Sequence, residues 1–186
     1  MLKPTLPLTT ERLVLRAFTP GDLDALYAYS SRPDVARYLY WEPRDLPAAQ
    51  AALDRNLNRT ALNAEGDVLE LAVTLRDSGE LIGSVLLIWT SQAHQQGEIG
   101  YILHPGHHGR GYAPEAAREL LRLGFEDLHL HRITGRLDAR NTASARVLEK
   151  LGMRREAHLI ENEFVKGEWV DEAVYAILAT EWRAQQ

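Results

Sequence analysis

Two spacings of apolar residues alternate along this chain of 186 residues. From Leu69 to Leu75 every second residue is apolar, as in a strand with one buried face. From Ala113 to Leu128 the apolar residues recur every three or four positions, as in a helix with one buried face. The same patterns predict strands over residues 12–16, 69–75, 81–89, 97–103, 133–138, 153–164 and 169–180. They predict helices over residues 46–63, 113–128 and 142–151, and one more that begins after Asp22 and is stopped by Pro33.

The order of these elements is strand, two helices, three strands, helix, strand, helix and two strands. This order predicts an α/β fold in which helices cover a mixed sheet, and it differs from the strict alternation of a doubly wound fold. No repeat, low-complexity tract or linker interrupts the pattern. We therefore expect a single domain over residues 8–184.

Composition narrows the class of protein. Hydrophobic residues make up 45% of the chain, which is too many for a disordered protein, and the formal net charge is −5. This mild acidity argues against general nucleic-acid binding, which shows as a basic excess. The absence of cysteine excludes disulfides, zinc–thiolate sites and a thiol nucleophile. With no signal sequence or membrane-spanning run in sight, a cytoplasmic domain with no membrane or nucleic-acid partner is the expectation.

The most informative stretch covers residues 97–117, where a strand runs through a glycine-bearing turn directly into a helix. Gly109 and Gly111 allow the backbone to turn sharply, and the unpaired N–H groups at the start of the helix then form an anion site, most naturally for phosphate or pyrophosphate. A plain strand–turn–helix connection remains the alternative. The P-loop and dinucleotide-binding patterns both fit poorly, because Gly111 is followed by Tyr112 and a proline stands at position 114.

Three blocks carry a family resemblance. His108-Gly-Arg-Gly-Tyr-Ala113 corresponds to a Gln/Arg-x-x-Gly-x-Gly/Ala motif, with histidine in the first position. Residues 10–16 (T-E-R-L-V-L-R) are typical of a first strand, and residues 141–153 match an N-x-x-S…K-L-G-F block with methionine for phenylalanine. In these blocks the chain resembles the GCN5-related N-acetyltransferases (GNAT), and more narrowly the branch of the Rim-type ribosomal-protein N-terminal acetyltransferases.

The resemblance implies a fold and a co-substrate. The fold is a mixed, mostly antiparallel sheet of six to seven strands with about four flanking helices, in which two central strands splay apart to admit acetyl-CoA; the family needs no metal. By position, backbone groups of three strand residues pair with pantetheine, a turn holds the pyrophosphate, and an asparagine bonds the pantetheine arm. These cofactor-binding residues are Tyr101, Ile102, Leu103, His108, Gly109, Arg110, Gly111, Tyr112, Ala113 and Asn141. A purely structural role for the asparagine, as the cap of the helix that follows, stays open.

Three residues are candidates for catalysis of amine attack on a thioester. The amine must lose a proton to a base, and the departing thiolate must gain one from an acid. Ser144 shares a helical face with apolar residues, and in related enzymes this serine is the proposed acid; Tyr101 and Tyr112 are alternative donors. For the base, Glu163 occupies the position of the base glutamate in Rim-type relatives and is the first choice. Glu98 is the second, and a bulge in its strand would decide which face it uses.

The predicted activity is direct transfer of acetyl from acetyl-CoA to a primary amine, either a protein N-terminus or a small molecule. A non-catalytic CoA or acyl-CoA sensor of the same fold and a nucleotide-binding module are the alternatives. Tyr38 and Trp41 are candidates for the acceptor side. His104, His107 and His108 cluster without the spacing of a helical metal pair, so no metal site is predicted. A homodimer is common in the branch that the chain resembles.

Overall fold

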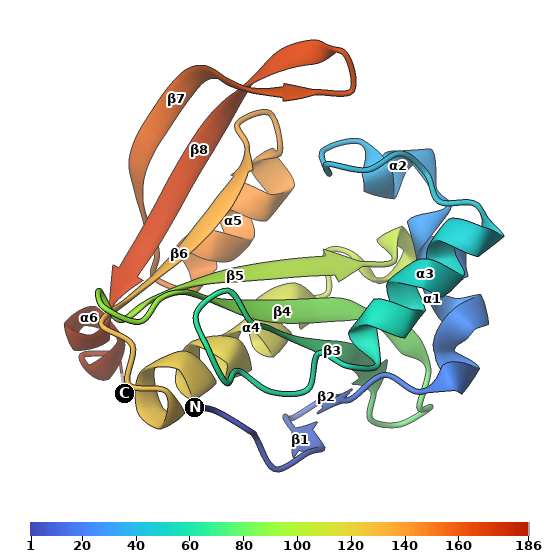
Figure 1. The fold of residues 1–186 in the computed structure, drawn as a ribbon, viewed down its shortest axis with the longest axis horizontal. Helices are drawn as coiled ribbons and strands as arrows, with labels where there is room; N and C mark the ends of the chain where they lie inside the picture. The colour runs from blue at the N-terminus through green and yellow to red at the C-terminus, as the bar shows by residue number, and fades with distance from the viewer. Residues whose placement is uncertain (186) are drawn as a thin grey trace.

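A computed structural model describes residues 1–185, which form one mixed eight-stranded sheet in the order β1-β2-β3-β4-β5-β6-β8-β7 (Figure 1). The strands are β1 (Leu8–Thr9), β2 (Leu13–Arg16), β3 (Val68–Leu75), β4 (Leu81–Ser91), β5 (Gln96–Leu103), β6 (Arg132–Asp138), β7 (Arg154–Val165) and β8 (Glu168–Leu178). The helices are α1 (Leu23–Ser30), α2 (Pro33–Ala36), α3 (Leu46–Asn56), α4 (Tyr112–Arg122), α5 (Thr142–Lys150) and α6 (Ala179–Arg183). The predicted α/β class and mixed sheet are confirmed. The additional elements are short, namely the two-residue strand β1 and the helices α2 and α6.

The predicted end of α3 is wrong, and Pro33 has a further role. The helix predicted over residues 46–63 ends at Asn56, because the following segment turns back and Leu62 exchanges two backbone hydrogen bonds of 2.7 Å with Leu2. Pro33 does more than stop α1, since it is the first residue of the separate helix α2. Proline is favoured there because the first turn of a helix does not need its N–H group.

Helices cover both faces of the sheet and enclose two apolar clusters. The larger cluster lies on the face of α4, where the small and apolar stripe of α4 (Ala116, Ala117, Leu120, Leu121) packs on alternate residues of the central strands. The smaller cluster lies on the other face, where α1 and α3 pack on β3. Alternate residues of one strand therefore belong to different clusters: Ile99 packs toward α4, whereas Ile102 packs toward α1 and α3.

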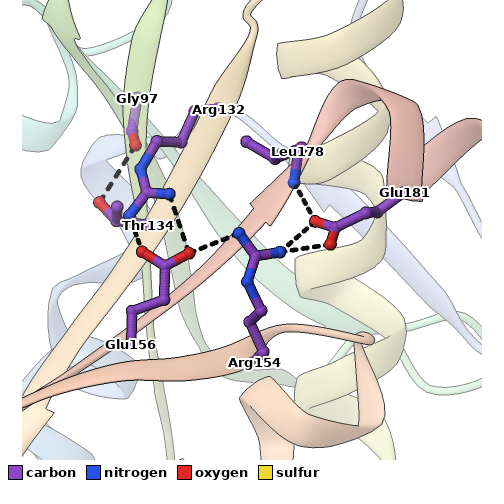
Figure 2. Close-up of polar contacts among 7 residues, drawn as sticks. All are labelled: Gly97, Arg132, Thr134, Arg154, Glu156, Leu178 and Glu181. Atoms are coloured by element: carbon purple, nitrogen blue, oxygen red, sulfur yellow. Dashed lines mark hydrogen bonds and ion pairs between the residues drawn. The ribbon is translucent and has the colours of Figure 1, made fainter.

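The only parallel pair among the described strands is β5 with β6, and it is short. Pairing covers Gln96–Glu98 with Arg132–Thr134, and the Thr134 hydroxyl donates to the Gly97 carbonyl at 3.3 Å (Figure 2). Beyond this point β5 continues along β4 as far as Leu103, while β6 continues along β8 as far as Asp138. The two central strands therefore diverge, as the family resemblance predicts.

A row of ion pairs lies beside the closed end of this divergence. Arg132 on β6 pairs with Glu156 on β7, Glu156 pairs with Arg154, and Arg154 pairs with Glu181 on α6 (Figure 2). Because these side chains are partly exposed, we expect each pair to contribute at most about 1 kcal/mol to stability. The row links three elements where β5 and β6 are still paired.

Candidate active site

A cavity of about 510 Å³ opens where β5 and β6 diverge, within the usual volume of small-molecule sites. Its walls come from β5, from the turn before α4, from α5 and from α2. The structure thus brings together nine of the ten residues predicted to bind the cofactor: Tyr101, Ile102, Leu103, His108, Gly109, Gly111, Tyr112, Ala113 and Asn141. Ser144 also lines the cavity, whereas Arg110, Glu98 and Glu163 are not among its lining residues in the described part of the chain.

The turn before α4 has the geometry of an anion site. Gly109 and Gly111 have φ angles of 74° and 81°, in the left-handed region that glycine adopts without penalty, and Gly111 is the N-cap of α4. Within residues 1–185, the N–H groups of residues 109–113 have no acceptor. Five free amide donors therefore lie at the positive end of an eleven-residue helix, and four of these five residues line a cavity large enough for a ligand.

Positive charge reaches the cavity from α5, which the sequence analysis did not anticipate. Arg146 and Lys150 both line it, one helical turn apart. Their i, i+4 spacing on the helix that also carries Ser144 was the available signal. Arg110, which was predicted to bind the cofactor, is exposed, and Arg118 on α4 lies over the Trp182 ring at 5.1 Å.

Asn141 caps α5 and also lines the cavity. Its Oδ1 accepts a hydrogen bond of 3.1 Å from the N–H of Ser144, so it caps α5 as the structural alternative predicts. The same side chain lines the cavity, and its Nδ2 donates to no group in residues 1–185. An amide donor is therefore available to a ligand while the cap is in place.

Two hydroxyl groups in the lining of the cavity are hydrogen-bonded to each other. The Ser144 hydroxyl on α5 donates to the Tyr101 hydroxyl on β5 at 2.9 Å, and the Tyr101 hydroxyl donates to the backbone carbonyl of Ser144 at 2.8 Å. Burial raises the pKa of Tyr101, so it remains protonated at neutral pH. Tyr112 lies elsewhere, beneath the Arg12 guanidinium at 4.8 Å, at the turn.

Glu98 lies on the opposite face of β5 from Tyr101. The register of β4 with β5 is unbroken from Gly83↔Leu103 to Trp89↔Gly97, so side chains alternate between faces without a bulge. Glu98 is half-buried at the last residue paired with β6. Burial is the largest cause that raises the pKa of Glu98; the Arg136 charge opposes this rise, and nearby carboxylates add to it.

Glu163 is held by a residue that the sequence analysis did not single out. The phenol of Tyr40, in the segment between α2 and α3, donates to Glu163 Oε2 at 2.6 Å. A second contact joins the same two regions, because Lys166 Nζ donates to the Ala36 carbonyl at 2.5 Å. Figure 1 shows α2 facing the tip of the β7–β8 hairpin across the open end of the sheet. Nothing in the sequence marks Tyr40, since its partner lies 123 positions away.

The neighbours of Tyr40 occupy different environments. Tyr38 lines the cavity, and its place on the acceptor side stays a prediction. Trp41 is stacked under the Arg44 guanidinium at 4.1 Å and is not among the described lining residues.

The three clustered histidines contact backbone groups and one exposed carboxylate. His104 Nδ1 accepts from the Gly106 N–H, His108 Nε2 lies 2.9 Å from the Leu103 carbonyl, and His107 Nε2 lies 3.2 Å from Glu80. Among residues 1–185, no group of three or more His, Cys, Asp and Glu side chains is arranged to hold a metal ion. None of the helices in this part of the chain is long and apolar enough to span a membrane.

Comparison with known proteins decides the family. Residues 12–154 match the model of the acetyltransferase (GNAT) domain. The chain belongs to the GNAT family. It is 36% identical over 176 residues to the uncharacterized N-acetyltransferase YnaD of Bacillus subtilis, covering 94% of this chain and 98% of that relative. This GNAT protein is therefore an acetyl-CoA-dependent N-acetyltransferase, and the predicted family, fold and enzyme class are confirmed.

Solved structures agree with this assignment. A GNAT-family acetyltransferase from Bacillus anthracis superposes with a TM-score of 0.84 at 32% identity, covering 94% of this chain and 99% of that one. The spermidine N-acetyltransferase from Vibrio cholerae, solved with CoA and spermine, has a TM-score of 0.78 at 26% identity, covering 94% of this chain and 99% of that one. The placement in the Rim-type branch stays a prediction.

The turn allows a direct test. Replacing Gly111 with alanine forces a side chain into the left-handed region and places its Cβ 3.3 Å from Arg12 Nη2. We expect the strain of about 1–2 kcal/mol to be relieved by a shift of the turn, so that the Kd for CoA measured by calorimetry rises about tenfold. Gly66→Ala is the matched control, because Gly66 has a φ of 91° and open space around it, remote from the cavity. Equal CoA affinity in Gly111→Ala and Gly66→Ala would count against this role of the turn.

Proposed function

We propose that this GNAT enzyme transfers acetyl directly from acetyl-CoA to a small cationic primary amine, with Glu98 as the general base and the Ser144–Tyr101 pair as the donor to the thiolate. One observation supports this most strongly. A cavity lies between β5 and a turn with five free amide donors and holds the Tyr101 hydroxyl, while the Glu98 carboxylate lies on the opposite face of β5, where its pairing with β6 ends. In this proposal pantetheine lies between β5 and β6, beside Tyr101–Leu103 and Asn141.

The proposed chemistry uses the two faces separately. Glu98 removes a proton from the ammonium group, and the free nitrogen attacks the acetyl carbon to form the C–N bond. The C–S bond then breaks, and its electron pair leaves on the sulfur. A hydroxyl of the Ser144–Tyr101 pair rotates about its C–O bond and donates its proton to the sulfur. The second proton of the nitrogen passes through water to the oxygen of that hydroxyl, which restores the pair, and Glu98 releases its proton to solvent. Because the amine approaches from the face of β5 that carries Glu98, the thiol leaves on the face that carries Tyr101.

The surroundings of the two glutamates favour Glu98 as the base over Glu163, the first choice from sequence. Glu98 is half-buried where the strands part, and its pKa is raised toward neutrality, which suits a base. Glu163 lies on the β7–β8 hairpin and already accepts a hydrogen bond from Tyr40. We propose that Glu163 acts on the acceptor side, where its charge attracts an ammonium group.

The acceptor side supports a small amine. Tyr40–Glu163 and Lys166–Ala36 join the two rims at the open end of the sheet, so a folded protein would have to separate them in order to enter. The charges that act on Glu98 are the guanidinium of Arg136 and the carboxylates of Glu163 and Glu172. Together with Glu98 this group has three carboxylates and one guanidinium, and the excess of negative charge favours a cationic acceptor. A relative of known structure is a spermidine acetyltransferase, which is consistent with this class.

A screen for thiol release tests the proposal. Purified protein with acetyl-CoA is offered polyamines, aminoglycoside-like amines, amino acids and peptides with varied N-termini. We expect release of CoA with at least one small cationic amine and little with the peptides. Turnover confined to peptides would overturn the small-amine assignment and favour the Rim-type branch, and CoA binding without turnover of any amine would favour the non-catalytic sensor.

We also propose that the protein forms a homodimer. Ile160, Phe164 and Trp169 on the β7–β8 hairpin are 70%, 61% and 60% exposed, and the two aromatic rings pack at 5.3 Å. Apolar side chains on a sheet edge are suited to burial by a second copy. Light scattering of the purified protein should give twice the 21.0 kDa mass of the chain; a mass of one chain would contradict the dimer.

A further inference from the structure

The start of β2 is joined to the turn before α4 by a compact set of polar contacts. Both oxygens of Glu115, in the first turn of α4, are occupied. Oε1 accepts from the Thr10 hydroxyl at 2.6 Å and from the Arg12 N–H at 2.9 Å. Oε2 accepts from Arg12 Nε at 2.7 Å and lies 2.6 Å from Arg12 Nη2. Two nitrogens of the Arg12 guanidinium therefore converge on one oxygen of the Glu115 carboxylate, in a charge-assisted pair.

The remaining side-chain contacts of Arg12 fall on the turn itself. Arg12 Nη1 donates to the Arg110 carbonyl at 2.8 Å, and the guanidinium lies over the Tyr112 ring at 4.8 Å from its centre. The Cβ position of Gly111 is 3.3 Å from Arg12 Nη2. One side chain therefore touches three successive residues of the turn. Among residues 1–185, the cavity lining includes Gly111 and Tyr112 but neither Arg12 nor Glu115.

From this arrangement we infer that Arg12 and Glu115 are positioning residues, which hold the turn in the shape that binds the diphosphate of CoA. The inference rests on the proposed place of the diphosphate at residues 109–113. Neither side chain touches the ligand in this account. They act through the backbone of Arg110 and Gly111.

The turn needs such support for two physical reasons. Its two glycines with positive φ give the backbone conformational freedom that would be lost when a ligand binds. The Arg12–Glu115 pair restricts this freedom before binding, which lowers the entropic cost. In addition, an unpaired carboxylate in the first turn of α4 would repel a diphosphate. Burial alone would raise the pKa of Glu115, yet the hydrogen bonds from Thr10 and Arg12 bring it below its ordinary value. The carboxylate is therefore charged, and Arg12 neutralises it.

The test compares two acetyl donors. Acetyl-CoA carries the diphosphate, whereas S-acetylpantetheine has the same thioester and pantetheine arm without it. For Arg12→Ala and Glu115→Gln we expect the Kd for CoA to rise about tenfold, with kcat/KM for S-acetylpantetheine within about twofold of wild type. The double variant should bind CoA no more weakly than the worse single variant, because the two residues act as one unit. Arg12→Lys should recover part of the affinity, since a lysine can pair with Glu115 but does not reach the Arg110 carbonyl at the same time.

Arg154→Ala is the matched control. Arg154 is also a surface arginine in ion pairs, and its side chain is 44% exposed against 43% for Arg12, but it lies at the closed end of the sheet. We expect this variant to bind CoA as wild type does. Unchanged CoA affinity in Arg12→Ala, or an equal loss with both acetyl donors, would overturn the inference. Failure of wild type to bind CoA would instead refute the proposed place of the cofactor.

Discussion

Replacing Glu98 with glutamine is expected to lower kcat/KM by about 10²–10⁴-fold, the usual contribution of a general base. Glutamine keeps the shape of the side chain, so the Kd for CoA should not change. Steady-state thiol release with the best amine of the screen measures the effect. Glu163→Gln, in contrast, removes only a charge on the acceptor side and should raise KM for the amine with little change in kcat. A larger loss of kcat in Glu163→Gln than in Glu98→Gln would restore Glu163 as the base.

The pH dependence separates loss of a base from loss of shape. Glu98 accepts a proton only as the carboxylate, and burial, the largest cause, raises its pKa above the ordinary 4.5. Activity is therefore lost as the pH falls through this raised pKa. Because Glu98 takes its proton from the bound ammonium group, we expect log(kcat/KM) in wild type to be level above the pKa of Glu98 and to fall with a slope of one below it. Glu98→Gln can use only amine that is already deprotonated, so it should show a slope of one throughout; a level region in that variant would assign the base elsewhere.

Removal of the hydroxyl pair is expected to have the second largest effect. Tyr101→Phe and Ser144→Ala should each lower kcat by about 10²-fold, because the thiolate then lacks its donor. The double variant should be hardly worse than either single variant, since the two hydroxyls share one hydrogen-bond unit. Tyr112→Phe is the matched control, because the Tyr112 ring lies at the turn beneath Arg12 and should change kcat less than about threefold. Full activity in both single variants would mean that the thiolate leaves without their help.

Local sequence patterns predicted the parts of the structure that depend on local chemistry. Alternation of apolar residues predicted β3 and β5, and the pair Gly109–Gly111 before an apolar helical stripe predicted the sharp turn that leads into α4. Asn141 was recognised as a cap candidate because asparagine accepts hydrogen bonds from a helix N-terminus. Each of these features depends on residues within a few positions of one another.

Features that depend on distant residues were missed. The Tyr40–Glu163 contact joins residues 123 positions apart, and the Arg12–Glu115 clamp joins residues 103 positions apart. No spacing rule marks such pairs before the sheet order is known. The face used by Glu98 likewise depended on the register of β4 with β5. The end of α3 was missed for the same reason, since it depends on the backbone hydrogen bonds between Leu62 and the distant Leu2.

The central claim is that the turn over residues 109–113 binds the diphosphate while pantetheine lies between β5 and β6. A crystal structure of the complex with CoA tests it most directly. The account predicts diphosphate oxygens about 3 Å from the free N–H groups of this turn, with the thiol near Ser144 and Tyr101. A structure in which the turn binds nothing, or in which the pantetheine arm lies outside the divergence of the two strands, would contradict it.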